Sequence, residues 1–257
     1  IYVYSSSELG IQEEDEEDDE VEELELDCGK VVPLEFSMAT FPHLQVLSQP
    51  WNISWASEAD LELPMTVNQI SRGLARNRTS WFFHNLASLH WRKIGDGQRA
   101  LDCAKRSLHF ASRSFKDVPL LNLGVMLQRA QCSAEAAILL HSAVDHAPHR
   151  PQGHFVLANV YAVLGDYNRS IGCYDNALGL DPDWTQVKST KHAVLCRKKL
   201  EQLFLQLNSF LQDIMTQLKD YSSVYERWLK TQEEVLKHKA PLPSPPLSSL
   251  SMFSSYK

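Results

Sequence analysis

The sequence predicts an all-α fold in which helical hairpins stack into a solenoid, and three observations lead to that prediction. Residues 117–150 and 151–184 repeat one pattern of small and large side chains at a spacing of 34 residues. Gly165 and Pro182 fall where that pattern requires a turn and a helix end. Apolar residues then recur three or four positions apart within 185–239, which contains no glycine or proline. We therefore expect a helical repeat array, a C-terminal amphipathic helical extension and disordered termini.

Residues 1–30 contain a run of acidic side chains and are expected to be disordered. Eleven of the 32 acidic residues lie between Glu13 and Glu25, and the rest of the chain has 21 against 25 lysines and arginines. The net charge of -7 therefore describes this segment and not the whole surface. Like charges and few apolar side chains cannot offset the entropy of ordering. We favour a solvated tail over a weak site for calcium or a basic partner.

Residues 31–79 are expected to form an irregular segment that packs against the adjoining repeats, because four prolines interrupt it at positions 33, 42, 50 and 64. Residues 240–257 are rich in proline and serine and are expected to form a tail without a packed fold. The chain begins with Ile1 and not with methionine. We expect a fragment or a processed product, from which a targeting signal could have been lost.

The repeated units, 117–150 and 151–184, place small residues where two helices of a hairpin would cross. Leu123-Gly124 in the first unit corresponds to Leu157-Ala158 in the second, and Ala136 corresponds to Ser170. Small side chains allow the helices to approach closely, and the larger ones fill the space beside the crossing. In residue types and period the units resemble the tetratricopeptide repeat (TPR) family. This resemblance implies a non-enzymatic domain with a concave groove that holds an extended or helical segment of a partner protein.

A third, degenerate unit is predicted at 80–116. It contains Trp81, Leu86-Ala87, Gly95-Asp96, Ala100, Ala104 and Leu108. Its first helix aligns with the other units in one register and its second helix one residue later. We therefore expect a single-residue insertion in the turn between them.

Residues 185–239 are expected to form a capping, amphipathic helical segment. The apolar stripe comprises Leu200, Leu203, Leu207, Phe210, Ile214, Leu218, Tyr221, Tyr225 and Trp228. One helix over this range would be about 80 Å long. We expect the segment to fold back near residues 206–209 or 220–223, so that its first hairpin caps the array.

The phase of the repeats predicts which residues face the groove. They are His84, Ser88, Val118, Leu121, Val125, Gln128, Arg129, Gln152, Phe155, Asn159 and Ala162. Chaperone-binding members of the family hold a terminal carboxylate through lysines, arginines and a central asparagine. Here Asn122 takes the asparagine position, but His84, Gln152 and Val156 take the basic ones. Without those cations the charge-assisted bonds are missing, so we expect a neutral groove and not a carboxylate-clamp co-chaperone.

No pattern in the sequence points to catalysis, a cofactor or a metal. There is no glycine-rich phosphate loop, HExxH motif or recognisable nucleophile arrangement. His141, His146 and His149 lie close together, but a metal site there is disfavoured because His149 follows the helix-ending Pro148. The five cysteines, at positions 28, 103, 132, 173 and 196, are odd in number and lack a CxxC pair. Their spacing supports neither a disulfide framework nor a zinc site.

Three N-glycosylation sequons, at Asn52, Asn77 and Asn168, leave the compartment open. We expect Asn77 and Asn168 to be exposed. The order of acidic run, degenerate unit and tandem repeats also resembles part of a large vertebrate member of the family. That resemblance implies a cytoplasmic or cytoskeletal adaptor linked to actin-regulating proteins, actin filament polymerisation and cilium assembly.

Two alternatives remain. The first is a glycosylated adaptor of the secretory pathway, if the complete chain has a signal peptide. The second is an oligomerisation module in which residues 203–228 pair as a coiled coil. No nucleic-acid partner is expected. A membrane span is not expected either, because no stretch approaches about 18 consecutive apolar residues.

Overall fold

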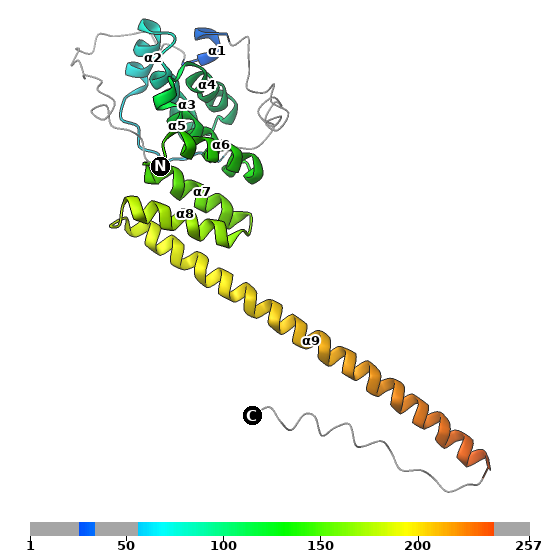
Figure 1. Cartoon of the computed structure of the whole chain (residues 1–257). Coiled ribbons are helices and arrows are strands. Elements are labelled where there is room, and N and C mark those ends of the chain that lie inside the picture. Colours follow the sequence, from blue (N-terminus) through cyan, green and yellow to red (C-terminus); the bar gives the residue numbers. More distant parts are fainter. Residues whose placement is uncertain (1–25, 34–55, 239–257) are drawn as a thin grey trace. The chain divides into compact units, whose positions relative to one another are not determined.

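The computed structural model describes residues 26–33 and 56–238, and all the regular secondary structure in these ranges is helical (Figure 1). The prediction of an all-α helical-hairpin fold is therefore confirmed. Residues 1–25, 34–55 and 239–257 lie outside the described part, and with them the acidic run, the sequon at Asn52 and the proline- and serine-rich tail.

Three antiparallel hairpins form the array, one within each predicted unit. They pair α3 (Trp81–Ile94) with α4 (Gly97–Phe110), α5 (Asp117–Arg129) with α6 (Ser133–His146), and α7 (Pro151–Val163) with α8 (Tyr167–Leu180). Each turn contains one residue with positive φ, namely Gly95 (99°), Gln131 (65°) or Gly165 (79°). Left-handed residues of this kind end the first helix of a hairpin and let the chain reverse.

Small residues bring the helices of a hairpin together, as the repeat pattern predicted. A Cβ atom on Gly124 of α5 would lie 2.6 Å from Cγ of Leu140 on α6, so only glycine fits there without a shift. In the third hairpin the Ser170 hydroxyl donates to the Ala158 carbonyl at 2.8 Å across the same kind of crossing. One apolar cluster extends from Leu26 to Tyr161, and a second joins α7 and α8 to the start of the next helix.

The first hairpin has a simpler register than the sequence suggested. Its helices begin at residues 81 and 97, and both lie 36 positions before their counterparts at 117 and 133. The expected insertion in the turn is therefore wrong. Compared with the 34-residue unit, the two extra residues lie after the second helix, in the connection 111–116. That connection contains the short 3-10 helix η3 (Arg113–Phe115).

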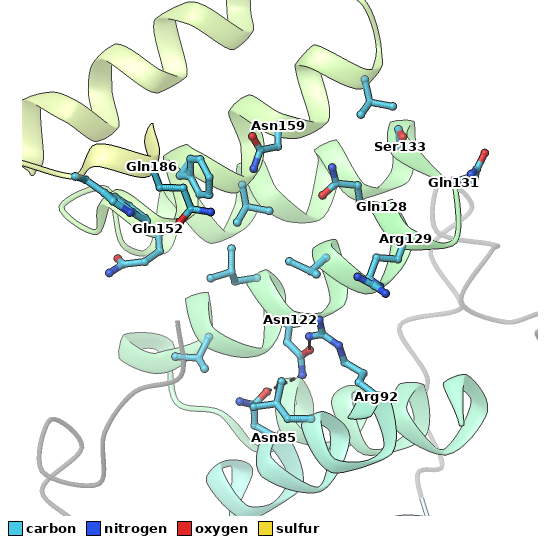
Figure 2. A pocket seen from close by; sticks show the side chains of 18 of the residues that line it. Asn85, Arg92, Asn122, Gln128, Arg129, Gln131, Ser133, Gln152, Asn159 and Gln186 are labelled. Atoms are coloured by element: carbon cyan, nitrogen blue, oxygen red, sulfur yellow. Dashed lines mark hydrogen bonds between the residues drawn. The ribbon is translucent and has the colours of Figure 1, made fainter. Parts of the chain in front are cut away.

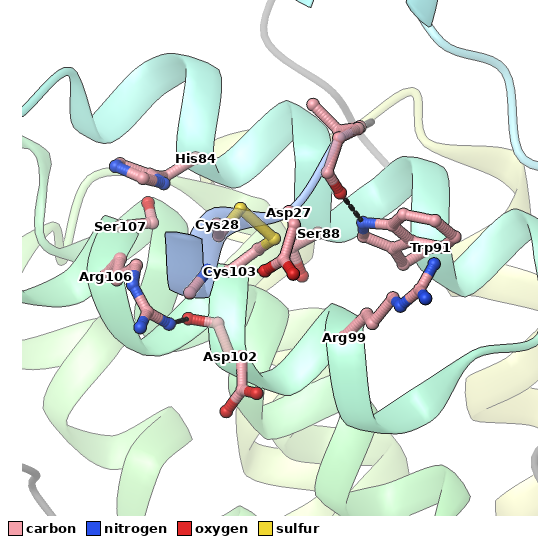
Figure 3. The surroundings of a disulfide bond; sticks show 12 residues. Asp27, Cys28, His84, Ser88, Trp91, Arg99, Asp102, Cys103, Arg106 and Ser107 are labelled. Carbon is pink, nitrogen blue, oxygen red and sulfur yellow. Dashed lines mark hydrogen bonds between the residues drawn. A yellow bond between two sulfur atoms is a disulfide. The ribbon is translucent and has the colours of Figure 1, made fainter. Parts of the chain in front are cut away.

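Two cysteines contradict the expectation that the cysteines lack disulfide partners. Cys28 and Cys103 form a disulfide that joins the short helix α1 (Cys28–Val31) to α4 (Figure 3). The Trp91 indole donates to the Leu26 carbonyl at 3.0 Å, and Arg106 donates to the Val32 carbonyl at 2.6 Å. Residues 26–30 are therefore held against the first hairpin. Spacing could not reveal this pair, because 75 residues separate its members.

The segment expected to be irregular contains a regular helix, α2 (Val67–Arg76). Thr66 and Gln69 form a capping box, in which the Thr66 hydroxyl accepts from the Gln69 backbone and the Gln69 side chain accepts from the Thr66 backbone. The helix buries Ile70 and Leu74 and packs on α3. The helix begins only after Pro64, so that proline precedes the helix instead of breaking it.

The last described element, α9 (Thr185–His238), is one helix of 54 residues, so the predicted fold-back is wrong. Serine and threonine within it donate to carbonyls of the preceding turn, as Thr216 does to Gln212 and Ser223 to Asp220. These residues therefore do not stop a helix that lacks glycine and proline. The chain divides into two compact units after Leu195. In the first unit, Val187 and Val194 cover the end of the array, and the described part of the second unit is residues 196–238. None of the described helices combines the length and apolar character needed to cross a membrane.

Candidate protein-binding groove

A groove of about 1020 Å³ lies along the first helices of the three hairpins (Figure 2). Residues of α3, α5 and α7 line it, together with Asp181, Trp184 and Gln186 from the end of the array. Valine, leucine and aromatic side chains alternate with the amides of Asn85, Gln128, Gln152 and Asn159. Such a surface offers apolar contacts together with hydrogen-bonding groups, which is the combination that protein interfaces use.

The structure brings together eight of the eleven residues predicted to face the groove. They are Val118, Leu121, Val125, Gln128, Arg129, Gln152, Phe155 and Asn159. All eight belong to the second and third units, where the 34-residue period is regular. That they contact a partner stays a prediction.

Three predicted residues lie elsewhere. His84 is fully buried, where its Nε2 is 2.9 Å from the Arg78 carbonyl oxygen and its ring stacks on Phe110. Ser88 is also fully buried, and it accepts a hydrogen bond from Asn122. Ala162 is half-buried and packs against the second apolar cluster.

The misplacement of His84 and Ser88 follows from the register of the first unit. Subtracting 36 from Leu121, Val125 and Gln128 gives Asn85, Leu89 and Arg92, and these three line the groove. An alignment that is one residue off rotates the expected face by about 100°. Asn85, Leu89 and Arg92 are four and three residues apart on one helix face, a spacing that could have revealed them.

A buried ion pair stands at the α3 end of the groove. Arg92 is fully buried and donates from Nε and Nη2 to the two carboxylate oxygens of Glu58, at 2.9 and 2.7 Å. The Glu58 backbone N–H also donates to the Arg92 carbonyl, and Arg129 lies 3.3 Å from the same carboxylate. Burial lowers the pKa of Arg92, whereas the bonds to Glu58 favour its charged form. The Glu58 carboxylate therefore already binds both Arg92 and Arg129.

Asn122 takes part in the same network (Figure 2). Its carbonyl oxygen accepts from Arg92, and its amide donates to Asn85 at 2.9 Å and to Ser88 at 3.1 Å. The side chain at the clamp asparagine position is thus bonded within the protein. Gln152 and Val156, at positions where the clamp has cations, line the groove as neutral side chains.

Aromatic side chains form the other end of the groove. The ring of Phe155 lies 5.0 Å from that of Trp184 and 6.1 Å from that of Tyr174, measured between centroids. The Tyr174 hydroxyl donates to Oδ1 of Asn159 at 2.6 Å, and burial raises the pKa of Tyr174 to about 12, so it stays a donor. This bond orients the Asn159 amide, whose nitrogen can then donate to a bound peptide carbonyl.

The histidines and the sequons at Asn77 and Asn168 that were singled out in the sequence lie outside the residues that line the groove. His141 hydrogen-bonds the Tyr161 hydroxyl, and within residues 26–33 and 56–238 no three histidine, cysteine or acidic side chains gather as a metal site would require. Asn77 and Asn168 are exposed, as expected. Asn77 caps the end of α2 and Asn168 lies in the first turn of α8.

Comparison with known proteins agrees with the repeat architecture. The family model described as Tetratricopeptide repeat matches residues 151–184, which contain α7 and α8. The chain is 38% identical over 226 residues to Tetratricopeptide repeat protein 17 of Danio rerio, an alignment that covers 83% of this chain and 19% of that protein. The proteins of the same name from Mus musculus and Homo sapiens are 37% identical over 227 residues, covering 83% of this chain and 19% and 20% of theirs. The chain thus spans about a fifth of the length of these relatives.

Proposed function

Because the chain carries tetratricopeptide repeats and is homologous to part of Tetratricopeptide repeat protein 17, we propose that it is a non-enzymatic adaptor that binds a segment of a partner protein in its groove. The observation that carries this proposal is the groove itself, with an apolar floor, neutral amides and a volume of about 1020 Å³. Apolar side chains of a bound segment would contact Leu121 and Phe155. The amides of Gln128 and Asn159 would bond to its backbone.

Affinity capture tests the groove. The repeat array is compared with Leu121→Ala/Phe155→Ala, which removes two large apolar contacts from the groove. Loss of two central anchors weakens binding by about 30-fold or more, since each costs on the order of 1–2 kcal/mol. The matched control is Ile138→Ala, which shortens an exposed side chain of α6 outside the groove. A set of captured proteins that both variants retain equally would contradict the groove assignment, provided that all three arrays unfold at similar temperatures.

For the process served, the first candidate is actin filament polymerisation and organisation together with cilium assembly, in the cytoplasm or cytoskeleton. Its support is the resemblance in the order of acidic run, degenerate unit and tandem repeats. The partner would then be an actin-regulating protein. Cells depleted of the protein should lose cilia and filamentous actin, and the wild type but not Leu121→Ala/Phe155→Ala should restore both. Restoration by the groove variant would separate this process from the groove.

The second candidate is a glycosylated adaptor in the lumen of the secretory pathway, and the disulfide between Cys28 and Cys103 favours it. Disulfides persist in oxidising compartments and are rare in the cytosol. The exposed sequon residues Asn77 and Asn168 are compatible with the same compartment. We therefore expect the full-length protein from cells to migrate faster on a gel after glycosidase treatment. Unchanged migration, together with a reduced Cys28, would exclude the luminal candidate.

A further inference from the structure

The second unit of the chain contains two sets of residues at a strict seven-residue spacing along α9, and all of them except Gln232 are apolar. One set comprises Leu200, Leu207, Ile214, Tyr221, Trp228 and Val235, and the other comprises Phe204, Leu211, Leu218, Tyr225 and Gln232. We name these eleven positions the seam. Seven of the side chains are exposed, from 38% at Tyr221 to 67% at Leu200, whereas Ile214, Trp228 and Val235 are half-buried and Gln232 is buried.

Between residues 198 and 237, the charged side chains other than Glu201 lie away from the seam and its borders. They are Lys198, Lys199, Asp213, Lys219, Asp220, Glu226, Arg227, Lys230, Glu233, Glu234 and Lys237, all at the three heptad positions farthest from the seam. Between residues 200 and 237, Glu201 is the one charged residue that borders it. The bordering positions instead include exposed Leu203, Phe210 and Met215. The helix therefore has one apolar face and one charged face.

A seven-residue apolar repeat of this length is the pattern of helices that wind around each other. Two apolar positions per heptad keep one face turned toward a partner helix when both helices supercoil. A helix with so much exposed apolar surface gains most of its stability from packing. The pattern therefore calls for a helical partner with the same period.

We propose that the seam is a self-association surface, and that a second copy of this chain covers it. The residues that border the seam on one helix lie close to those that border it on the other, so like charges there would repel. Their near absence removes that repulsion. With roughly 80–100 Å² still exposed on each of the seven exposed seam side chains and on the bordering Leu203, Phe210 and Met215, two helices would bury on the order of 1,600–2,000 Å². Stable protein interfaces typically bury about that area.

Self-association adds to the adaptor function without depending on it. Two copies would present two grooves in one particle, so a partner with two binding segments would be held more tightly than by either groove alone. The seam itself lies within residues 200–235 and shares no residue with the groove. Failure of one proposal therefore leaves the other standing.

Light scattering coupled to size-exclusion chromatography of the full chain, over a wide range of concentration, tests the proposal. The wild type should have at least twice the chain mass of 29.2 kDa. Leu211→Glu/Leu218→Glu should weaken self-association by roughly 100-fold or more, because it places carboxylates in an apolar seam. High salt should leave the wild-type mass unchanged, since the seam is uncharged.

The matched control adds the same two charges outside the seam. Leu205→Glu/Gln212→Glu changes two exposed residues that are also seven positions apart, and it should keep the wild-type mass. A monomeric wild type would overturn the proposal and would assign the seam to another helix. Equal loss of self-association in both double variants would show that the seam is not the surface through which the copies associate. If the array in each variant unfolds at the same temperature as in the wild type, neither result can be attributed to a failure to fold.

Discussion

At the scale of single residues, Arg92 and Glu58 join the N-terminal segment to the array. Arg92 is fully buried on α3, and Glu58 lies in the chain before α2. The two make a bidentate pair, and the Glu58 backbone N–H adds a bond to the Arg92 carbonyl. A charge at this depth is tolerated only because its partner is present. The pair thus holds residues near position 58 at the end of the groove.

Glu58→Gln removes the charge that balances Arg92 and should lower the free energy of unfolding by about 3–5 kcal/mol. Urea denaturation at neutral pH measures it. Glu62→Gln is the control, because it makes the same change at an exposed residue four positions away and should stay within about 0.5 kcal/mol of the wild type. Equal midpoints for the two variants would show that the buried pair contributes nothing.

His84 adds a pH dependence. Burial lowers its pKa from 6.5 to about 4, and its Nδ1 has no hydrogen-bond partner among the described residues. The unfolded chain therefore binds the proton first as the pH falls. The stability from this residue is fully present above about pH 6.5 and is lost toward pH 4, by on the order of 3 kcal/mol.

His84→Gln isolates this effect, since an amide can still donate to the Arg78 carbonyl but does not titrate. Urea denaturation between pH 7 and pH 4 should show a smaller loss of stability in the variant than in the wild type. Parallel curves for the two proteins would mean that the pKa of His84 is the same in the folded and the unfolded chain.

At the scale of helices, Gly124 sets the distance between α5 and α6. Alanine there would place its Cβ 2.6 Å from a buried leucine, so Gly124→Ala should destabilise the protein by about 1–3 kcal/mol. Gly172→Ala on α8 is the matched control, because its Cβ would meet no atom within 4 Å. Helix propensity should make that variant more stable by up to about 1 kcal/mol. Thermal unfolding distinguishes the two, and equal effects of the same sign would contradict the close approach.

The disulfide holds α1 on the first hairpin. The Cys28→Ser/Cys103→Ser variant should lose about 2–5 kcal/mol of stability, because the loop closed by cysteines 75 positions apart regains freedom in the unfolded chain. Cleavage near residues 26–33 by a protease should become faster in the same variant. Cys196→Ser, at an exposed cysteine of α9, is the control and should change neither measurement. Equal cleavage of all three proteins would show that packing alone retains α1.

At the scale of the whole chain, the sequence predicted the groove-lining residues best in the second and third units, where the 34-residue repeat is regular. The groove positions of α5 and α7, such as Leu121 and Phe155, follow from one period and were placed correctly around the groove. In the first unit Leu86-Ala87 imitates Leu123-Gly124 one residue out of register, so Asn85 and Arg92 were missed. The continuity of α9 was also missed, although residues 185–239 contain no glycine or proline, because an amphipathic pattern has the same period in one long helix as in a hairpin of two.

The sequence by itself determined the helical hairpins and their order. The signals for each hairpin lie within one 34-residue unit. Helix periodicity, small residues at the crossing and turn residues are all recognised among residues close together in the sequence. Only the tertiary structure decided that Glu58 neutralises Arg92, 34 residues away, and that Cys28 meets Cys103, 75 residues away. Glu58 and Cys28 belong to segments without a repeating pattern. Their partners depend on where the folded array brings distant residues together, and no local spacing records that.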